Sequence, residues 1–341
     1  MLSIFLCGSI CIQLFKKTEA LLKFLLSSLP IYIPLMAILS INNLTKNYRS
    51  IRALDNVSFA VPPKTVFGIL GPNGSGKTTL LGIVMDILKP TNGSFKWAGE
   101  QSSDELRKQI GTLLETPNFY HYLSGEDNLK IAARIKGKGL DDIPKVLKTV
   151  NLYDRRKSKF NSYSLGMKQR LAIASTLLGD PGILVFDEPT NGLDPAGIAE
   201  IRELIKDLNR QGKTIIMASH ILDEVEKVCT HVAIIQKGVL KTVGSVHEIM
   251  HTSGTQNVAS LLIELSAADN DLLKNILQGM SGLESVAETD NGIEIICPEN
   301  ITPEQVNSYC FEKGVVLNKL NVKRKSLETR FLEITGKQSD R

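Results

Sequence analysis

The segment Gly71-Pro72-Asn73-Gly74-Ser75-Gly76-Lys77-Thr78-Thr79 fits the pattern G-x-x-x-x-G-K-[ST]. The apolar run Val66–Leu70 precedes it and a helical pattern starts at Lys77, which is the strand, turn and helix context that this pattern requires. Glycines let the backbone wrap so tightly that its N–H groups and the positive end of the helix converge on phosphate groups. We expect all nine residues to contact a nucleotide, with Lys77 on the β and γ phosphates and the Thr78 hydroxyl on Mg²⁺.

A second motif is the apolar run Ile183-Leu184-Val185-Phe186, which ends in the acids Asp187 and Glu188. A purely structural strand would place a turn residue there, although the pair could also cap a helix that begins at Pro189. Together with the glycine loop, the pair predicts nucleotide hydrolysis. We expect Asp187 to hold Mg²⁺ through its water shell, and Glu188 to orient or deprotonate the attacking water.

Three further motifs resemble those of the ABC family of ATP-binding proteins. Tyr163-Ser164-Leu165-Gly166-Met167-Lys168-Gln169-Arg170 is similar to the signature L-S-G-G-Q, Asn191-Gly192-Leu193-Asp194 to the D-loop, and Ser219-His220 to the switch histidine. Five motifs occur in the family's order over residues 36–244, about six-tenths of the chain. The resemblance implies a P-loop NTPase with a RecA-like, mostly parallel sheet. It also implies a head-to-tail dimer that holds ATP between one subunit's phosphate loop and the other's signature.

The same resemblance assigns further site residues. Ser164 and the Gly166 N–H are expected to contact the γ-phosphate across the dimer, and Asp194 to couple the two sites. His220 is expected to bond the γ-phosphate from the end of a strand, although a lone histidine is often inert. Tyr48 lies before the glycine loop and is expected to stack on adenine, unless it is only a surface aromatic in a turn.

Some positions depart from the family pattern. Leu165 and Met167 stand where glycine and glutamine are usual, so contact with the partner's ATP is expected to depend mainly on Ser164 and Gly166. Glu115 stands where the Q-loop has glutamine. Its carboxylate can face Mg²⁺ but adds a titratable negative charge beside the phosphates, unless it is simply a surface residue. This substitution and the signature as spelled here are similar to the bacitracin and lantibiotic exporter branch.

The order of patterns predicts an α/β architecture. Apolar runs predict strands that alternate with helical patterns, which indicates a mostly parallel sheet. The runs are residues 38–44, 53–61, 66–70, 110–114, 183–186, 214–218 and 232–236. Residues 115–179 show only helical patterns, which predicts a helical subdomain inserted into that sheet.

Past residue 252 the pattern becomes βαββαβ, which predicts a small ferredoxin-like α+β domain followed by a last helix with one buried face. The predicted divisions are an apolar N-terminal extension at 1–35, the ATP-binding domain at 36–250, and a C-terminal accessory domain at 251–341. Packing or dimer support is the favoured role of the last domain, and a small-molecule regulatory site is the alternative.

Residues 1–35 are apolar and unlike the remainder of the chain. Neither apolar run is a convincing membrane span, and no basic residue precedes the first run as a secretory signal would require. The favoured interpretation is a start codon assigned upstream of Met36. The alternatives are a membrane-associating segment and a helix that packs on the domain.

The composition of the chain limits the kinds of partner that it is expected to bind. Forty basic and 36 acidic side chains leave a net charge of +4, which argues against nucleic acid as the main partner. Five scattered cysteines predict no disulfide framework and a reducing, intracellular setting. The chain lacks the several spans of a permease, so we expect a separate transmembrane permease, with this chain at the cytoplasmic face of a bacterial membrane. Export is favoured by family likeness alone, and the alternative is a soluble ABC ATPase that acts on DNA or ribosomes.

Overall fold

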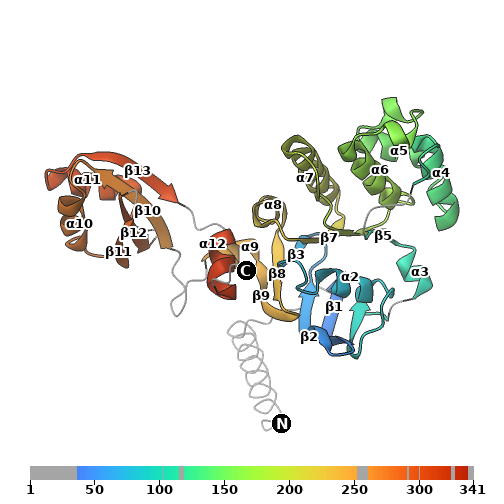
Figure 1. The fold of residues 1–341 in the computed structure, drawn as a ribbon, viewed down its shortest axis with the longest axis horizontal. Coiled ribbons are helices and arrows are strands. Elements are labelled where there is room, and N and C mark those ends of the chain that lie inside the picture. The colour runs from blue at the N-terminus through green and yellow to red at the C-terminus, as the bar shows by residue number, and fades with distance from the viewer. Residues whose placement is uncertain are drawn as a thin grey trace, which may run out of the picture.

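The computed structural model describes residues 37–101, 103–114, 119–251, 260–289, 292–298, 300–323 and 327–336 (Figure 1). The predictions for residues 1–35 and for Glu115 lie outside these ranges. Three sheets are present in the described part, with six, three and four strands. None of the helices in the described ranges has the length and apolar character needed to span a membrane.

The central sheet has the strand order β5-β6-β7-β3-β8-β9. The first five strands are parallel and β9 is antiparallel to β8, which confirms the predicted mostly parallel sheet. The strands are β3 (Val66–Leu70), β5 (Ile110–Leu113), β6 (Ile183–Asp187), β7 (Thr214–Ser219), β8 (His231–Gln236) and β9 (Val239–Ser245). All residues of β3 and β7 are buried, as expected of strands covered on both faces. In the register Leu70 pairs with Ser219, and Asp187 with Ala218, so the motif-bearing strand ends meet at one edge.

The first two predicted strands are not part of the parallel sheet, and in this respect the sequence-based prediction was wrong. β1 (Leu39–Tyr48) and β2 (Ile51–Val61) form a separate antiparallel sheet with β4 (Asn92–Trp97) in the order β2-β1-β4. Only Arg49 and Ser50 connect β1 to β2, and Arg49 has a φ of 53°. A two-residue turn can join antiparallel strands, whereas parallel strands need a long crossover.

Helices cover the central sheet and form the predicted helical block. Between β5 and β6 the structure has only helices in its described part, and Leu129, Leu147 and Leu171 are fully buried among them. The helices are α2 (Lys77–Val84), α3 (Asp104–Arg107), α4 (Gly125–Lys136), α5 (Ile143–Thr149), η1 (Tyr153–Arg155), η2 (Phe160–Ser162), α6 (Leu165–Leu177), α7 (Pro195–Arg210), α8 (Leu222–Val228) and α9 (Val246–His251).

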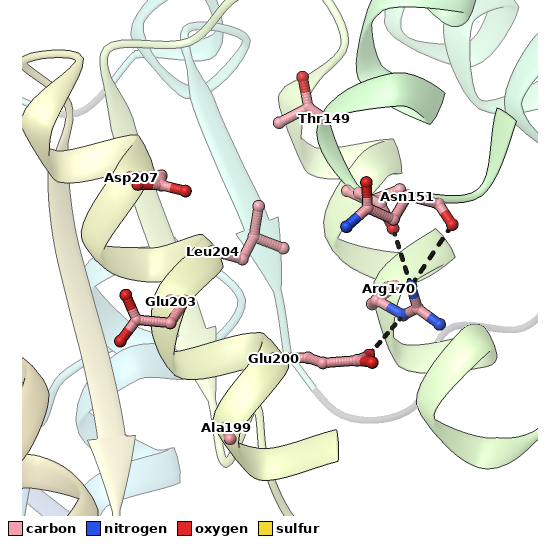
Figure 2. A pocket seen from close by; sticks show the side chains of 9 residues that line it. Thr149, Asn151, Arg170, Ala199, Glu200, Glu203, Leu204 and Asp207 are labelled. Carbon is pink, nitrogen blue, oxygen red and sulfur yellow. Dashed lines mark hydrogen bonds and ion pairs between the residues drawn. The ribbon is translucent and has the colours of Figure 1, made fainter. Parts of the chain in front are cut away.

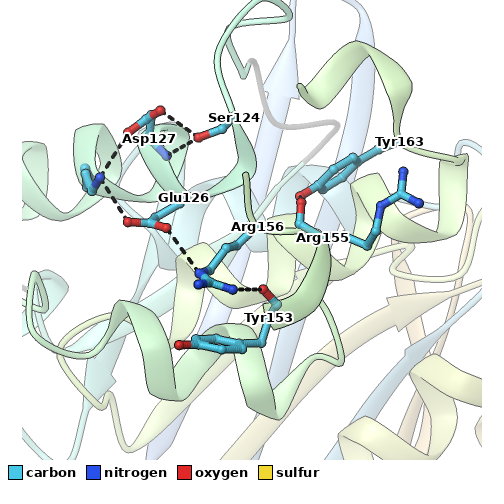
Figure 3. A network of polar contacts seen from close by, with 8 residues as sticks. Ser124, Glu126, Asp127, Tyr153, Arg155, Arg156 and Tyr163 are labelled. Carbon is cyan, nitrogen blue, oxygen red and sulfur yellow. Dashed lines mark hydrogen bonds and ion pairs between the residues drawn. The ribbon is translucent and has the colours of Figure 1, made fainter. Parts of the chain in front are cut away.

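A polar network fixes the start of α4 within this block (Figure 3). Ser124 caps the helix by accepting a hydrogen bond from the Asp127 N–H at 3.1 Å. Arg156 stacks on Tyr153 and lies 3.5 Å from Glu126, so it links η1 to α4. The Ser124 hydroxyl and the Lys130 ammonium hold the pKa of Asp127 below its usual range. The Asp127 side chain is 49% exposed, so these contacts orient the start of α4 and add little to the free energy of unfolding.

The C-terminal region forms a four-stranded antiparallel sheet with the order β11-β12-β10-β13. Its elements follow as β10 (Ser260–Ala267), α10 (Asn270–Gln278), β11 (Ser285–Thr289), β12 (Gly292–Pro298), α11 (Pro303–Glu312) and β13 (Leu317–Lys323). This order confirms the predicted ferredoxin-like arrangement. Its core, which includes Ile263, Leu273 and Val306, forms a cluster of its own. Figure 1 shows this sheet well apart from α4, α5 and α6.

The last helix, α12 (Leu327–Thr335), packs mainly against α8, α9 and β9. Leu327 is fully buried in the core of the central sheet. Its N–H donates to Glu226 Oε2 at 2.8 Å, and Arg330 Nε donates to the Ile249 carbonyl at 3.0 Å. After the C-terminal sheet, the chain therefore returns to the central sheet and packs on it through α12.

Leu327→Ala should lower the free energy of unfolding by about 2–5 kcal/mol, because it deletes a buried side chain from a packed core. Chemical denaturation followed by circular dichroism measures this change. Leu332→Ala is the matched control, since Leu332 lies on the same helix with 45% of its surface exposed. Equal stability of the two variants would contradict the packing of α12 described here.

The three cysteines in the described ranges, Cys229, Cys297 and Cys310, are buried and unpaired. Burial raises the pKa of each thiol, so thiolate formation is disfavoured. These side chains therefore act as small apolar core residues.

Candidate functional site

The glycine-rich loop joins β3 to α2 with a backbone that excludes side chains at two points. A Cβ at Gly71 would lie 2.2 Å from the Ile235 carbonyl oxygen, and one at Gly76 would lie 2.6 Å from the Ala53 carbonyl oxygen. Gly76 is the N-cap of α2 with a φ of 106°, which other residues rarely adopt. The loop residues therefore wrap around the N-terminus of α2, as the sequence predicted.

Lys77 is only 5% exposed and extends within this loop. Its ammonium Nζ donates to the Gly71 carbonyl at 2.8 Å and to the Pro72 carbonyl at 3.2 Å. The same Nζ lies 3.5 Å from Glu188 Oε1. A buried cation therefore connects the loop to the acidic end of β6.

The two acids lie where β6 ends. Asp187 is the last residue of β6 and is 9% exposed, while Glu188 follows in the left-handed region with a φ of 48°. The Glu188 N–H donates to the Ala218 carbonyl at 3.0 Å, which fixes this backbone against β7. A left-handed glutamate stores strain of about 1–3 kcal/mol, and such strain is frequent at functional sites.

His220 follows the last residue of β7 and contacts Glu188 directly. Its Nδ1 lies 2.8 Å from Glu188 Oε2, and the two side chains are 35% and 20% exposed. Lys77, Glu188 and His220 therefore form one continuous chain of polar contacts, although they come from three different segments. The motifs predicted a role for each residue, and the structure adds the contacts between them.

The predicted signature and D-loop lie together at another place on the molecule. Ser164 caps α6 by accepting from the Met167 N–H at 3.3 Å, and Asp194 caps α7 by accepting from the Gly197 N–H at 2.9 Å. Both capped helix ends line one groove of about 410 Å³. The lining residues are Ser164, Leu165, Gly166, Arg170, Gly192, Leu193, Asp194, Ala196, Gly197 and Glu200, and none belongs to the phosphate loop.

Arg170, which sequence analysis noted only within the signature, joins the two helices that line this groove (Figure 2). Its Nη1 donates to the Val150 carbonyl at 3.2 Å, and its Nε lies 3.3 Å from Glu200 Oε2. Arg170 thereby links α6 to α7 and borders a second pocket of about 390 Å³. The sequence gives no signal for this contact, because Arg170 and Glu200 lie on different helices.

The remaining predicted residues lie on other segments. Tyr48 ends β1 with 41% of its surface exposed, and the Lys46 ammonium lies 5.0 Å from its ring centre. Thr78 is exposed on the first turn of α2 and Thr79 is partly buried beside it. Glu115 lies outside the described residues. Phe119 packs edge-on against Phe160, with 5.2 Å between the two ring centres. Tyr120 is 49% exposed on the same loop.

Comparison with known proteins identifies the family of this chain. The family model described as ABC transporter matches residues 54–191. The bacitracin transport ATP-binding protein BcrA of Bacillus licheniformis is 34% identical over 304 residues, which cover 88% of this chain and 97% of BcrA. The lantibiotic transport ATP-binding protein SrtF of Streptococcus pyogenes is 40% identical over 200 residues, which cover 59% of this chain and 87% of SrtF.

Among solved structures, a dimeric post-hydrolysis ATP-binding cassette bound to ADP and phosphate is similar, with a TM-score of 0.54 and 28% identity. The match covers 61% of this chain and 98% of that chain. BcrA is similar over nearly its whole length, and the family model spans the glycine loop, the signature and the acidic strand. The chain therefore belongs to the ABC transporter family, as an ATP-binding subunit that hydrolyses ATP.

Proposed function

We propose that this subunit powers the export of antimicrobial peptides or drugs through a separate transmembrane permease. The observation that carries the proposal is the similarity to BcrA over nearly its full length, because BcrA is a bacitracin transport protein. The similarity to SrtF, a lantibiotic transport protein, points in the same direction. In this proposal the chain acts at the cytoplasmic face of a bacterial cell membrane, with no nucleic acid partner.

Within one subunit, the polar chain of Lys77, Glu188 and His220 would act on ATP. Lys77 would neutralise the β and γ phosphates, and His220 would bond the γ-phosphate. Glu188 would orient or deprotonate the attacking water, because its carboxylate lies beside both of these groups. Tyr48 would stack on adenine.

The residues present also fit Mg²⁺. Thr78 offers an exposed hydroxyl on α2, Asp187 offers a carboxylate at the end of β6, and α2 packs against β6. One or two protein oxygens together with phosphate oxygens are a usual ligand set for this ion. Bound Mg²⁺ would neutralise charge that develops on the phosphates. Glu115 would be a further group facing the ion.

Two subunits would assemble head to tail, as a homodimer or with a homologous ATP-binding subunit. The groove that contains Ser164, Gly166 and Asp194 includes no phosphate-loop residue, which supports a nucleotide site shared between two chains. The helix N-terminus at Ser164 favours the negative charge of a γ-phosphate. The similar cassette bound to ADP and phosphate is itself dimeric.

The permease would dock beside the loop that carries Phe119 and Tyr120, next to the helices α4 to α6. Tyr120 offers an exposed ring, and its N–H donates to the buried Asn128 side chain at 2.8 Å, which holds the loop in place.

The proposed division of the chain remains an ATP-binding domain at 36–250 and an accessory domain at 251–341. In this division α12 belongs in sequence to the accessory domain, although it packs on α8 of the ATP-binding domain.

Purification of a tagged Glu188→Gln variant from solubilised membranes tests the transport proposal. We expect a multi-spanning protein to co-purify in stoichiometric amount in the presence of ATP, because the variant is expected to stall in the ATP-bound dimer. Recovery of the variant from the soluble fraction only, with ribosomes, DNA or no partner, would overturn the export proposal. The ATPase assignment would survive that result, since it does not depend on the partner.

Glu115→Gln should retain at least about a tenth of the wild-type ATPase rate, because an amide oxygen can face Mg²⁺ as well as a carboxylate does. Steady-state phosphate release measures the rate. The apparent Mg²⁺ requirement should rise, since one negative charge near the ion is removed. Complete inactivity would show that the carboxylate itself is required.

A further inference from the structure

We propose that Thr190 and Glu224 form a positioning pair that couples the loop leading to Asp194 with the helix that follows His220. Neither residue was singled out by its sequence motif. The inference rests on the ATPase roles proposed above and concerns how contact with a second subunit reaches the catalytic centre.

The pair is a buried side-chain hydrogen bond between distant segments. The Thr190 hydroxyl Oγ1 donates to Glu224 Oε2, and both residues are only 3% exposed. Thr190 lies two residues after Glu188, and Glu224 lies in the first turn of α8. In this buried setting the bond is stronger than at the surface, so it can hold the two segments in one relative position.

The pair is also the inner of two links between the same segments. The outer link joins Glu188 to His220 at 2.8 Å and is partly exposed. Beyond Thr190, its carbonyl accepts a hydrogen bond from the Leu193 N–H at 3.2 Å, and Asp194 follows as the cap of α7. A displacement of Asp194 therefore acts on Thr190 and, through Glu224, on α8 and His220.

Fold stability alone does not account for a carboxylate at this position. Glu224 Oε1 is buried and accepts no hydrogen bond from any residue in the described part of the chain. A buried carboxylate oxygen without a donor costs free energy. An apolar side chain of similar volume would fill the space without this cost. Such a side chain could not, however, accept a hydrogen bond from the Thr190 hydroxyl.

The pair therefore acts on the rate of the chemical step more than on nucleotide binding. Neither residue belongs to the phosphate loop, so binding of ATP to Lys77 and its neighbours should not depend on the pair. The position of His220 relative to Glu188 should depend on it, because α8 begins two residues after His220. Loss of this hydrogen bond should therefore lower kcat and leave KM for ATP nearly constant.

Thr190→Val tests the pair, because valine keeps the shape and removes the hydroxyl. We expect kcat to fall about tenfold with KM for ATP within about twofold of the wild type. Thr190→Ser, which restores a hydroxyl, should recover at least about half of the wild-type kcat. Glu224→Gln, which still accepts from Thr190, should be more active than Glu224→Leu.

Thr176→Val is the matched control. Thr176 is 2% exposed, and its hydroxyl donates only to the Ile173 carbonyl within α6, so this variant should keep the wild-type kcat. A wild-type kcat for Thr190→Val, or equal losses for Thr190→Val and Thr176→Val, would overturn the pair's role. Absence of ATP hydrolysis by the wild-type chain would instead overturn the ATPase roles, and the pair's role with them.

Discussion

Glu188→Gln should lower kcat for ATP hydrolysis by at least about 100-fold while ATP affinity stays within about threefold of the wild type. Glutamine has the same shape as glutamate, so its side chain can stay in contact with Lys77 and His220. In the wild type, Glu188 Oε1 lies 3.5 Å from Lys77 Nζ, and Glu188 Oε2 lies 2.8 Å from His220 Nδ1. It cannot accept a proton from water. Steady-state phosphate release gives kcat, and titration with a fluorescent ATP analogue gives the affinity.

The same variant should convert to a dimer when ATP is added, because closure on ATP would no longer be followed by hydrolysis. Light scattering after size exclusion should show a doubled mass with ATP and the monomer mass with ADP. Glu203→Gln is the matched control, since its side chain is 58% exposed on α7 and should leave both kcat and mass unchanged. If Glu188→Gln keeps more than a tenth of kcat, Glu188 is not the group that activates water.

The apolar runs predicted the central strands well because parallel strands covered on both faces must be apolar along their whole length. The same criterion missed β4 and β9. In β4 only Trp97 is buried, so no apolar run marks the strand. In β9 most residues alternate between exposed and half-buried, so no apolar run marks this strand either. Lys237 and Gly238, both with positive φ, form the hairpin turn that joins β8 to β9.

The sequence also predicted which residues make up the candidate site, because each motif combines a loop geometry with a chemical group. It could not predict contacts that depend on how strands are ordered in the sheet. Glu188 meets His220 because β6 and β7 are neighbours, with Asp187 paired to Ala218. Arg170 and Glu224 were missed because their partners lie 30 and 34 residues away on other segments, and the packing of helices and loops that brings them together leaves no local pattern in the sequence.

Gly71→Ala should weaken ATP binding by at least about 100-fold, which corresponds to about 2.7 kcal/mol. The new Cβ would lie 2.2 Å from the Ile235 carbonyl oxygen and 2.4 Å from Ser75 Oγ. Ile235 belongs to β8, which is paired with β3 and β9, so its backbone cannot move without disturbing the sheet. Ser75 is buried as well, with 1% of its surface exposed. The loop itself must therefore shift, and its N–H groups lose their alignment on the phosphates.

Isothermal titration with ATP measures this loss, and circular dichroism establishes that the variant is folded. Gly182→Ala is the matched control, because a Cβ at Gly182 meets no atom within 4 Å and its φ is not left-handed. Gly182→Ala should therefore bind ATP as the wild type does. Gly76→Ala should resemble Gly71→Ala, since its Cβ would lie 2.6 Å from the Ala53 carbonyl oxygen at a φ of 106°. A folded Gly71→Ala variant with wild-type affinity would show that ATP does not bind through the backbone of this loop.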